Sequence, residues 1–512
     1  MSTATTSQAV TEKNLATRII IGIVLSAMTT LMLIFAFPPA NIWPFAFICM
    51  IPMLVAQYRV LPKRWTFLAR IIGGDLWVLW LVTMLFGFSA ETWFIQLIPV
   101  ISAVISFTTA RGVREFHERT NYRWFVLHGM VDWVGFEMIR SFIPLVRMHG
   151  FIGHTVHTQP WLIQPVSMFS IYGLDLVILL VNYTLAQGIF ALIDRKWQFE
   201  DTPLINKRQA RGWLAGAGAT LALWIGISLV ILAGAPKEPE TIRVAAVQSG
   251  VPTPAHWPLD QPQEKYLTPL FEQTRAAAQQ GAQLIVWPEL AIGFDPQKEH
   301  TAELQALAAE TDATLVIGYG VADEGEVSRN AAVPLTPAGE FLAIYGKSHI
   351  PPGEIWDPDA GKYPVYETEL GTWGTLICHD TNFTESGRIL AAKGAQFLAV
   401  PTFEAYIPGF EQIFYIQMVF RSVENRMATI KADSAFSASI VDPYGRVLAL
   451  KSGAPDGEAF ALVEDVPVVE SGTLYTSLGD WMGWVSLAGF VFFMIYPDVV
   501  KKRQQKQLSE AE

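Results

Sequence analysis

The chain contains a series of long apolar runs, and these constrain its fold more than any other feature of the sequence. Each run approaches the roughly 20 apolar residues that a helix needs to cross a bilayer. The runs lie at about 18–37, 42–58, 67–88, 92–110, 124–142, 162–190, 213–235 and 481–498. We therefore predict a transmembrane helical domain of about seven spans over 18–235, and a C-terminal transmembrane helix over 481–498.

The overall composition supports a membrane protein and excludes some alternatives. Hydrophobic residues make up 51% of the chain and charged residues only 16%, which is unusual for a soluble enzyme. The net charge of −11 and the lack of a basic stripe argue against nucleic acid as a partner. The two cysteines, Cys49 and Cys378, have no zinc-site spacing, and Cys49 lies inside an apolar run, so we expect no disulfide.

The basic residues of the connections predict the orientation in the membrane. They gather before the first run, in alternate connections and after the last run, whereas the opposite connections are almost free of them. Arg147 is the exception. The basic residues concerned are Lys13, Arg18, Arg59, Lys63, Arg64, Arg70, Arg111, Arg114, Arg119, Arg123, Arg195, Lys196, Lys207, Arg208, Arg211, Lys501, Lys502 and Arg503. By the positive-inside rule both termini are cytoplasmic, and the large insert at 240–478 lies on the outer face.

The two ends of the chain are polar. Residues 1–17 are expected to be disordered, and residues 499–512 to form a cytoplasmic tail. The first apolar run is not expected to be a cleaved signal peptide, because further spans follow it.

The insert alternates strand-like and helix-like segments, which predicts a layered α/β domain. Two segments with turn composition, Thr336–Gly339 and Asp442–Gly445, add hairpins. The expected strands are 241–248, 283–287, 314–318, 330–335, 341–345 and 396–401, and the expected helices are 262–280, 301–310, 384–393 and 411–427.

Three residues of the insert stand directly after expected strands and carry complementary chemistry. Glu289 follows Leu-Ile-Val-Trp-Pro, Lys347 follows Ile-Tyr-Gly, and Cys378 follows Thr-Leu-Ile. A thiol nucleophile needs a base that takes its proton and a cation that holds the charge on an attacked carbonyl. Taken singly, each residue could equally be a surface charge or a core thiol.

The three stretches together resemble the Glu-Lys-Cys motifs of the nitrilase, or carbon–nitrogen hydrolase, superfamily. Further stretches resemble the opening strand, the late hairpin and the helix after the cysteine of that superfamily. They are Arg243–Gln248, Val441–Val447 and Arg421–Asn425. The resemblance implies a nitrilase-like α-β-β-α sandwich over 240–478.

The membrane part extends the resemblance to one branch of the superfamily, the apolipoprotein N-acyltransferase family. Its first loop, Phe37–Pro44, is similar to that of the family. Scattered polar, proline and glycine positions are similar as well, namely Glu137, Arg140, Pro160, Gln164, Gly173 and Asn182.

The resemblance implies an acyltransferase with a two-step exchange. Glu289 is the implied general base for Cys378, and Lys347 the implied oxyanion stabiliser. Cys378 would take an acyl chain from a membrane phospholipid as a thioester. It would then pass the chain to the α-amino group of the lipidated N-terminal cysteine of an apolipoprotein. Glu354 matches a second glutamate of the family's lysine loop.

The same resemblance implies no metal and no cofactor. It also implies a multi-pass protein of the bacterial inner membrane with its catalytic domain on the periplasmic, outer face. We expect a monomer.

Three departures from the acyltransferase pattern keep other functions open. His379 and Asp380, two auxiliary candidates, replace the usual aromatic residue and glutamate after the cysteine, and the segment between Lys347 and Cys378 is short. Val400–Glu404 replaces a Ser-Asn-Asp-type stretch. A membrane-anchored amidase with another substrate is therefore the alternative. A non-catalytic scaffold is a third hypothesis, against which the presence of all three catalytic candidates speaks.

Four residues after the next strand are candidates for binding substrate: Phe403, Glu404, Tyr406 and Phe410. The aromatic stretch beyond Glu404 is either a packed core segment or a lid that dips into the membrane. Three histidines share one outer loop, but their spacing fits no standard metal site. They are His149, His154 and His157.

Overall fold

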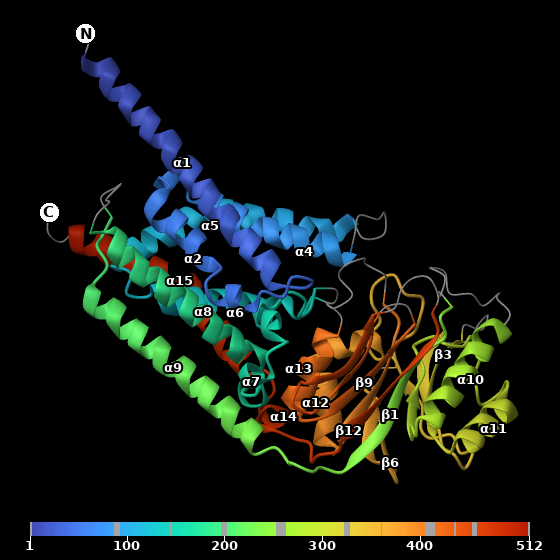
Figure 1. Ribbon diagram of the computed structural model, residues 1–512. Helices are drawn as coiled ribbons and strands as arrows, with labels where there is room; N and C mark the ends of the chain where they lie inside the picture. Colours follow the sequence, from blue (N-terminus) through green and yellow to red (C-terminus); the bar gives the residue numbers. More distant parts are fainter. Residues whose placement is uncertain are drawn as a thin grey trace.

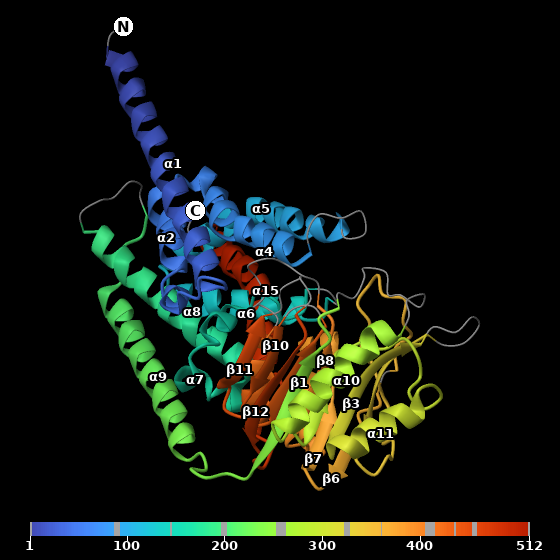
Figure 2. The same ribbon diagram turned by 45° about the vertical axis from the view of Figure 1, so that its right-hand side comes forward.

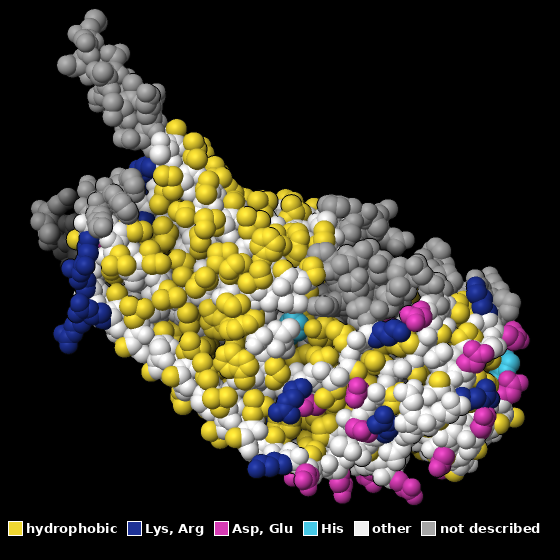
Figure 3. All heavy atoms as spheres, in the orientation of Figure 1, with side chains coloured by type: hydrophobic (Ala, Val, Ile, Leu, Met, Phe, Trp, Pro, Cys, Tyr) yellow, Lys and Arg dark blue, Asp and Glu magenta, His cyan; other side chains and the backbone are white. Residues whose placement is uncertain are grey.

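The computed structural model describes residues 3–509 except for 87–92, 144–145, 196–201, 252–262, 322–327, 360, 405–414, 435–436 and 453–457. Within these residues the chain forms a helical part and an α/β part that lie side by side (Figure 1). Hydrophobic side chains cover the visible face of the helical part, whereas charged side chains are spread over the α/β part (Figure 3).

Among the residues that the structure describes, the helical part contains six helical segments that are long and apolar enough to cross a membrane. They are Leu15–Ala36, Trp43–Val60, Lys63–Leu85, Trp93–Arg119, Val166–Ile193 and Lys207–Ala233. Several are interrupted rather than continuous. The full order is α1 (Thr3–Ala36), η1 (Trp43–Phe47), α2 (Met50–Val55), η2 (Ala56–Val60), η3 (Lys63–Trp65), α3 (Phe67–Arg70), η4 (Ile71–Asp75), α4 (Leu76–Phe86), η5 (Trp93–Gln96), α5 (Leu97–Arg119), α6 (Phe125–Arg140), η6 (Ile152–Val156), α7 (Pro160–Ile163), α8 (Val166–Ile193) and α9 (Lys207–Ala233).

The two remaining apolar runs form shorter apolar helices that pack against each other. The run at 124–142 forms α6, and the run at 481–498 forms the start of α15 (Trp481–Ser509), whose apolar stretch ends at Tyr496. Glycines allow the close approach, because a Cβ at Gly135 would lie only 2.5 Å from Phe490 Cβ. Small residues commonly serve this purpose between membrane helices.

Both ends of the chain are helical in the structure. The segment expected to be disordered is helical from Thr3, and α15 continues to Ser509 through most of the expected tail. Neither stretch contains a residue that stops a helix there, since 3–17 lacks both Gly and Pro. The start of α1 and the end of α15 lie at the end of the helical part away from the α/β part (Figure 1).

The α/β part is built on two six-stranded sheets. The first has the order β12-β1-β2-β3-β4-β5 and the second β11-β10-β9-β8-β7-β6. Strand bounds are β1 (Thr241–Gln248), β2 (Leu284–Val286), β3 (Thr314–Val321), β4 (Arg329–Leu335), β5 (Tyr345–Gly346), β6 (Val365–Thr368), β7 (Gly371–Thr375), β8 (Phe397–Thr402), β9 (Ala428–Asp433), β10 (Ser437–Val441), β11 (Val447–Ser452) and β12 (Phe460–Pro467).

The sheets face each other, and helices cover their outer faces (Figure 2). The first sheet carries α10 (Glu264–Gln279) and α11 (Thr301–Thr311). The second carries α12 (Thr384–Ala392) and α13 (Ile416–Asn425), with α14 (Leu474–Leu478) beside them. This arrangement confirms the predicted α-β-β-α sandwich. The hairpin at Asp442–Gly445 is also confirmed, since it joins the antiparallel strands β10 and β11.

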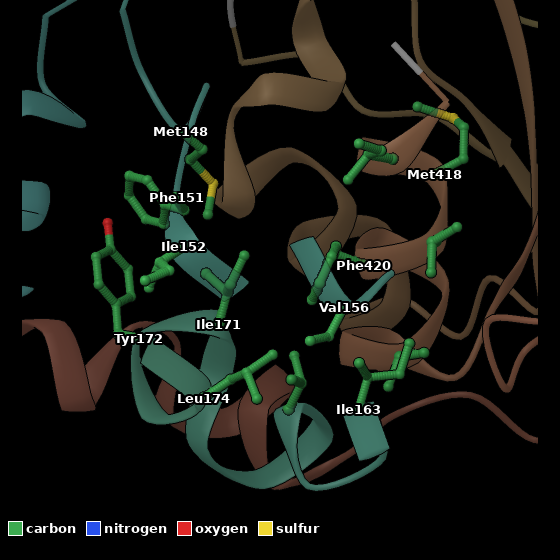
Figure 4. Packing of buried hydrophobic residues seen from close by; sticks show 14 of the residues in the cluster. Met148, Phe151, Ile152, Val156, Ile163, Ile171, Tyr172, Leu174, Met418 and Phe420 are labelled. Carbon is green, nitrogen blue, oxygen red and sulfur yellow. The ribbon is translucent and has the colours of Figure 1, made fainter. Parts of the chain in front are cut away.

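The helical part and the sandwich share one continuous hydrophobic core. Figure 4 shows Phe420 of α13 packed opposite residues of η6 and α8, among them Val156 and Ile171. Polar contacts cross the same seam. His157 Nε2 lies 3.0 Å from Tyr415 Oη, and Gln164 Nε2 donates to the Tyr444 carbonyl at 2.8 Å. The sandwich is thus packed onto the helices rather than joined to them only by a linker.

Candidate active site

Three strand ends bring the predicted catalytic residues to one edge of the sandwich. Glu289 follows β2 in the first sheet, Lys347 follows β5 in the same sheet, and Cys378 follows β7 in the second. Gly318 of β3 lies directly under the turn before Glu289, where a Cβ would come within 2.0 Å of the Pro288 carbonyl oxygen. Only glycine permits this close approach.

The Glu289 carboxylate is buried and accepts three hydrogen bonds. Oε1 accepts from Lys347 Nζ at 2.8 Å and from Asn330 Nδ2 at 2.7 Å. Oε2 accepts from the backbone N–H of Phe403 at 2.8 Å. The carboxylate is 2% exposed, so these three donors determine its position.

The Lys347 ammonium is fully buried between two carboxylates. It contacts Glu289 on one side and Glu354 on the other, each at 2.8 Å. Burial alone would lower the pKa of Lys347, but the charges of Glu289, Cys378 and Glu354 outweigh it and raise that pKa. The side chain therefore stays protonated, as an oxyanion stabiliser must.

Cys378 is presented on a sharp turn. It begins the short helix η7 (Cys378–Asn382), and its φ of +42° lies in the left-handed region that residues other than glycine rarely adopt. The thiol is partly exposed, and its Sγ donates to the Phe403 carbonyl at 3.6 Å. Desolvation and the charge of Glu289 raise the pKa of Cys378. The thiol therefore needs a neighbouring base for ionisation.

Phe403 links the two reacting groups through its backbone. Its N–H binds Glu289, and its carbonyl accepts from Cys378. Predicted as a substrate-binding residue, Phe403 contacts the site through its main chain.

Asp380 connects the loop that carries Lys347 to the turn that carries Cys378. Its buried carboxylate accepts from Tyr345 Oη at 2.8 Å and from the backbone N–H of His349 at 2.9 Å. It also accepts from His349 Nδ1 at 2.8 Å and from the Ile377 N–H at 3.3 Å. His379, the other auxiliary candidate, is buried and lies 3.1 Å from Asn382 within the same turn.

Glu404 lies at the end of β8 and belongs to a second buried charge cluster. It contacts Lys431 Nζ at 2.8 Å, and Lys431 contacts Asp433 at 2.7 Å. Burial raises the pKa of Glu404, and the nearby Asp433 raises it further, although Lys431 opposes the shift. The charge of Glu404 also acts on Cys378, so this cluster borders the site.

The comparisons with known proteins divide the chain as the fold does. Residues 29–184 match the apolipoprotein N-acyltransferase N-terminal domain family, and residues 243–458 match the carbon-nitrogen hydrolase family. The chain is 24% identical over 510 residues to the apolipoprotein N-acyltransferase of Geobacter metallireducens, covering 91% of this chain and 93% of that one. It belongs to the carbon–nitrogen hydrolase superfamily, in its apolipoprotein N-acyltransferase branch.

Two further proteins that resemble this chain are amidases by name. The deaminated glutathione amidase of Synechocystis sp. is 30% identical over 222 residues, covering 36% of this chain and 80% of that one. The crystal structure of an amidase from Nesterenkonia sp. is 24% identical, with a TM-score of 0.38, and covers 46% of this chain and 94% of that one.

The remaining residues that the sequence suggested for substrate or metal binding do not lie among the catalytic candidates in the described structure. Tyr406 and Phe410 fall outside the described residues. His154 of η6 and His157, directly after η6, are buried at the seam with α13. Among the residues that the structure describes, no three His, Cys, Asp or Glu side chains are placed to hold a metal.

Asn330 is a residue of the candidate site that the sequence alone did not indicate. Besides its bond to Glu289, its backbone carbonyl accepts from the Lys347 N–H at 2.8 Å. The only signal in the sequence was an amide at the start of an expected strand.

Proposed function

We propose that this protein transfers an acyl chain from a membrane phospholipid to the α-amino group of a lipidated N-terminal cysteine on an apolipoprotein. A thioester on Cys378 is the proposed intermediate. The observation that carries this proposal is the backbone link at Phe403, which holds the Glu289 carboxylate and the Cys378 thiol in one site beside the buried Lys347. Membership of the apolipoprotein N-acyltransferase branch supplies the substrates.

In the first half-reaction Glu289 takes the proton of the Cys378 thiol, and the thiolate attacks the ester carbonyl of the phospholipid. The Lys347 ammonium stabilises the oxyanion of the tetrahedral intermediate. The C–O bond then breaks, the proton on Glu289 passes to the leaving alkoxide, and a lysophospholipid departs. Cys378 remains as an acyl thioester.

In the second half-reaction the free α-amino group of the apolipoprotein attacks the thioester. Glu289 takes a proton from the attacking amine, Lys347 again faces the oxyanion, and the thiolate leaves. The C–S bond is exchanged for an amide bond, and the proton on Glu289 returns to Cys378. A thioester is a suitable intermediate because it is more reactive towards amines than the original ester.

Glu354 is the proposed positioning residue for Lys347. Its carboxylate holds the ammonium from the side opposite to Glu289 and is 32% exposed. Burial raises the pKa of Glu354, and the charge of Lys347 lowers it by less, so the pKa stands at about 7.

We propose a location in the bacterial inner membrane, with the sandwich on the periplasmic side. A group of Lys and Arg side chains lies at the end of the helical part away from the sandwich (Figure 3). Basic residues favour the cytoplasmic side, so the sandwich would face outwards.

The test is the intact mass of the purified chain after incubation with phospholipid and no acceptor. The wild type should gain the mass of one acyl chain, which a diacylglyceryl peptide with a free amine should discharge as an amide. Cys378→Ala should gain none. Cys49→Ala is the matched control and should behave as the wild type, because Cys49 is buried in the helical part. Equal mass gain in Cys378→Ala would refute the proposal.

A second candidate function is amide hydrolysis, because the amidase relative is 30% identical over the region that contains the site. Under this alternative small amides should release ammonia in the absence of phospholipid, and water alone should discharge the acyl-enzyme.

A further inference from the structure

A cavity of about 520 Å³ lies at the seam between the helical part and the sandwich, separate from the catalytic groups. Its walls come from the end of α6 and the segment after it, from α8, from η7 and α12, and from the connection between α14 and α15. Neither Cys378, Lys347 nor Glu289 lines it. The volume is typical of a small-molecule site.

Two guanidinium groups line this cavity from opposite parts of the protein. Arg147 comes from the loop after α6 and Arg388 from α12. Arg147 is also the basic residue that departs from the charge pattern of the outer connections, where the positive-inside rule gives it no role.

The guanidinium of Arg147 is held in place but not saturated. Its Nη1 donates to the Ser141 carbonyl at 2.7 Å, and its Cζ lies 3.4 Å from the centre of the Phe383 ring. Its Nε is buried and has no hydrogen-bond partner among the described residues. Arg388 uses Nη1 for a longer contact of 3.3 Å to the Thr476 carbonyl. Both groups therefore keep donors for a ligand.

Two carboxylates, Asp480 and Glu385, line the cavity together with the two arginines. Asp480 accepts from Thr384 Oγ1 at 2.6 Å, and burial raises its pKa. Glu385, the second carboxylate, acts on Arg147 through its negative charge. The cavity therefore offers a ligand the unfilled N–H donors of two guanidinium groups, rather than a net positive charge, and such donors suit a phosphate oxygen.

The edge of the cavity has the chemistry of a membrane interface. Phe142 and Trp484 line it, pack with ring centres 5.8 Å apart, and are 57% and 54% exposed. Leu478, another lining residue, is 53% exposed. Aromatic residues of this kind gather at the headgroup level of a bilayer, where lipid headgroups pass. α15 enters the apolar region directly after this point.

We infer that this cavity binds the phosphate of a membrane phospholipid between Arg147 and Arg388, with the acyl chains running outwards past Phe142 and Trp484. Arginine is well suited to phosphate because its planar fork offers paired donors. The cavity adjoins the turn that carries the candidate nucleophile. Cys378 begins η7, and Asn382, the last residue of η7, lines the cavity. The bound lipid would thus steady η7 without being the acyl donor. This inference does not depend on acyl transfer.

The test uses the full chain, purified and delipidated in detergent. The probe is a dialkyl ether phospholipid with a glycerol headgroup, which carries the phosphate but no ester that Cys378 could attack. Retained lipids are counted by native mass spectrometry. The variant is Arg147→Met with Arg388→Met, and the control is Arg275→Met, an exposed arginine of α10.

The wild type and the control should retain one phospholipid more than the double variant, whose affinity at this site should fall at least tenfold. Lipid in the catalytic pocket is common to all three proteins and cancels in this difference. The dialkylglycerol without phosphate should be retained equally by all three. Equal phospholipid counts, or equal retention of the two lipids by the wild type, would overturn the inference.

Inorganic phosphate distinguishes a lipid from a soluble ligand. If millimolar phosphate alone stabilises the wild type against heating as strongly as the phospholipid does, and fails to do so in the double variant, the lipid assignment is wrong. If the double variant does not fold, the single variant Arg388→Met decides. It should bind the phospholipid at least threefold more weakly, and unchanged binding would overturn the inference.

Discussion

At the scale of single residues, the position of Glu289 depends on donors from three separate parts of the chain. Lys347, Asn330 and the Phe403 N–H each contribute one hydrogen bond. Charged hydrogen bonds in a buried site are worth about 1.5–3 kcal/mol each. Loss of one donor should therefore displace the base without unfolding the protein.

Asn330 offers the sharpest test of this point. Asn330→Ala should slow the acylation of Cys378 about tenfold, because one donor to Glu289 is lost. Asn330→Asp should slow it about a hundredfold, because a second carboxylate would face the first one. The rate of acyl mass gain measures both. If both variants acylated Cys378 as fast as the wild type does, the Asn330 amide would not act on Glu289.

Glu354 should make the stability depend on pH. Its pKa rises from 4.5 to about 7 on folding, so between these values the folded state holds a proton that the unfolded state has released. The contribution of Glu354 to stability therefore falls as the pH rises from 4.5 to 7 and is constant above that. Because the group is partly exposed, we expect the apparent Tm of the wild type to drop by about 2 °C relative to Glu354→Gln across this range. A relative rise of the wild type would show that ion pairing with Lys347 outweighs burial.

The candidate catalytic residues were predictable from the sequence, whereas Asn330, which holds one of them in place, was not. Glu289, Lys347 and Cys378 each stand after a short apolar strand, and that local pattern is visible in the sequence. Asn330 lies 41 residues from Glu289 and meets it only because β3 and β4 pair in the first sheet. A single sequence does not contain that distance relation.

At the scale of elements, the turn η7 and the loop after β5 form one unit through Asp380. The loop brings Lys347 to the site and the turn brings Cys378, yet they come from different sheets. The four hydrogen bonds that Asp380 accepts from Tyr345, His349 and Ile377 hold the two together.

Asp380→Asn should separate the loop from the turn, because the new amide N–H₂ would face donors where the carboxylate accepted from them. We expect acylation of Cys378 to slow by at least tenfold and the apparent Tm to fall by several degrees. Asp442→Asn is the matched control. Asp442 likewise accepts two backbone N–H groups, but in the β10–β11 hairpin. This control should lower the Tm without slowing acylation; equal slowing would attribute the Asp380 effect to general destabilisation.

The elements were predictable where periodicity or turn composition is strong. The strands at β1, β2, β3 and β8 coincide with apolar runs between polar breaks, within a residue or a few. The expected strand at 341–345 was wrong, because only Tyr345–Gly346 joins the sheet while Phe341 makes a single bridge to Leu335. β6 was missed because it is only four residues long. β12 was missed because it carries charged residues, such as Glu464 and Asp465, and pairs with β1, which is distant in sequence.

At the scale of the whole molecule, the apolar runs predicted the helical part, but the seam with the sandwich could not be predicted. The sequence predicted a helix at 411–427 but not which of its faces would meet the helical part. In the structure α13 packs on the sheet with one side and on η6 and α8 with the other, which explains why all ten of its residues are buried.

The orientation of the molecule has a direct test. In a chain whose cysteines are replaced by alanine, Arg275→Cys places a thiol on the exposed surface of the sandwich, and Arg208→Cys places one at the basic end of α9. An impermeant maleimide should label Arg275→Cys in spheroplasts, and Arg208→Cys only after the membrane is permeabilised. The reverse pattern would place the sandwich in the cytoplasm.

The continuous core across the seam has a consequence for how substrates reach the enzyme. Because the sandwich cannot swing away from the helices, Cys378 keeps one height relative to the membrane. Lipids that diffuse in one leaflet present their ester bonds at nearly the same level, and an acceptor anchored by its own lipid presents its amine close to that level. Both reaction partners would then arrive sideways, within the plane of the membrane, and a molecule dissolved in the surrounding water would be excluded by its position rather than by its shape.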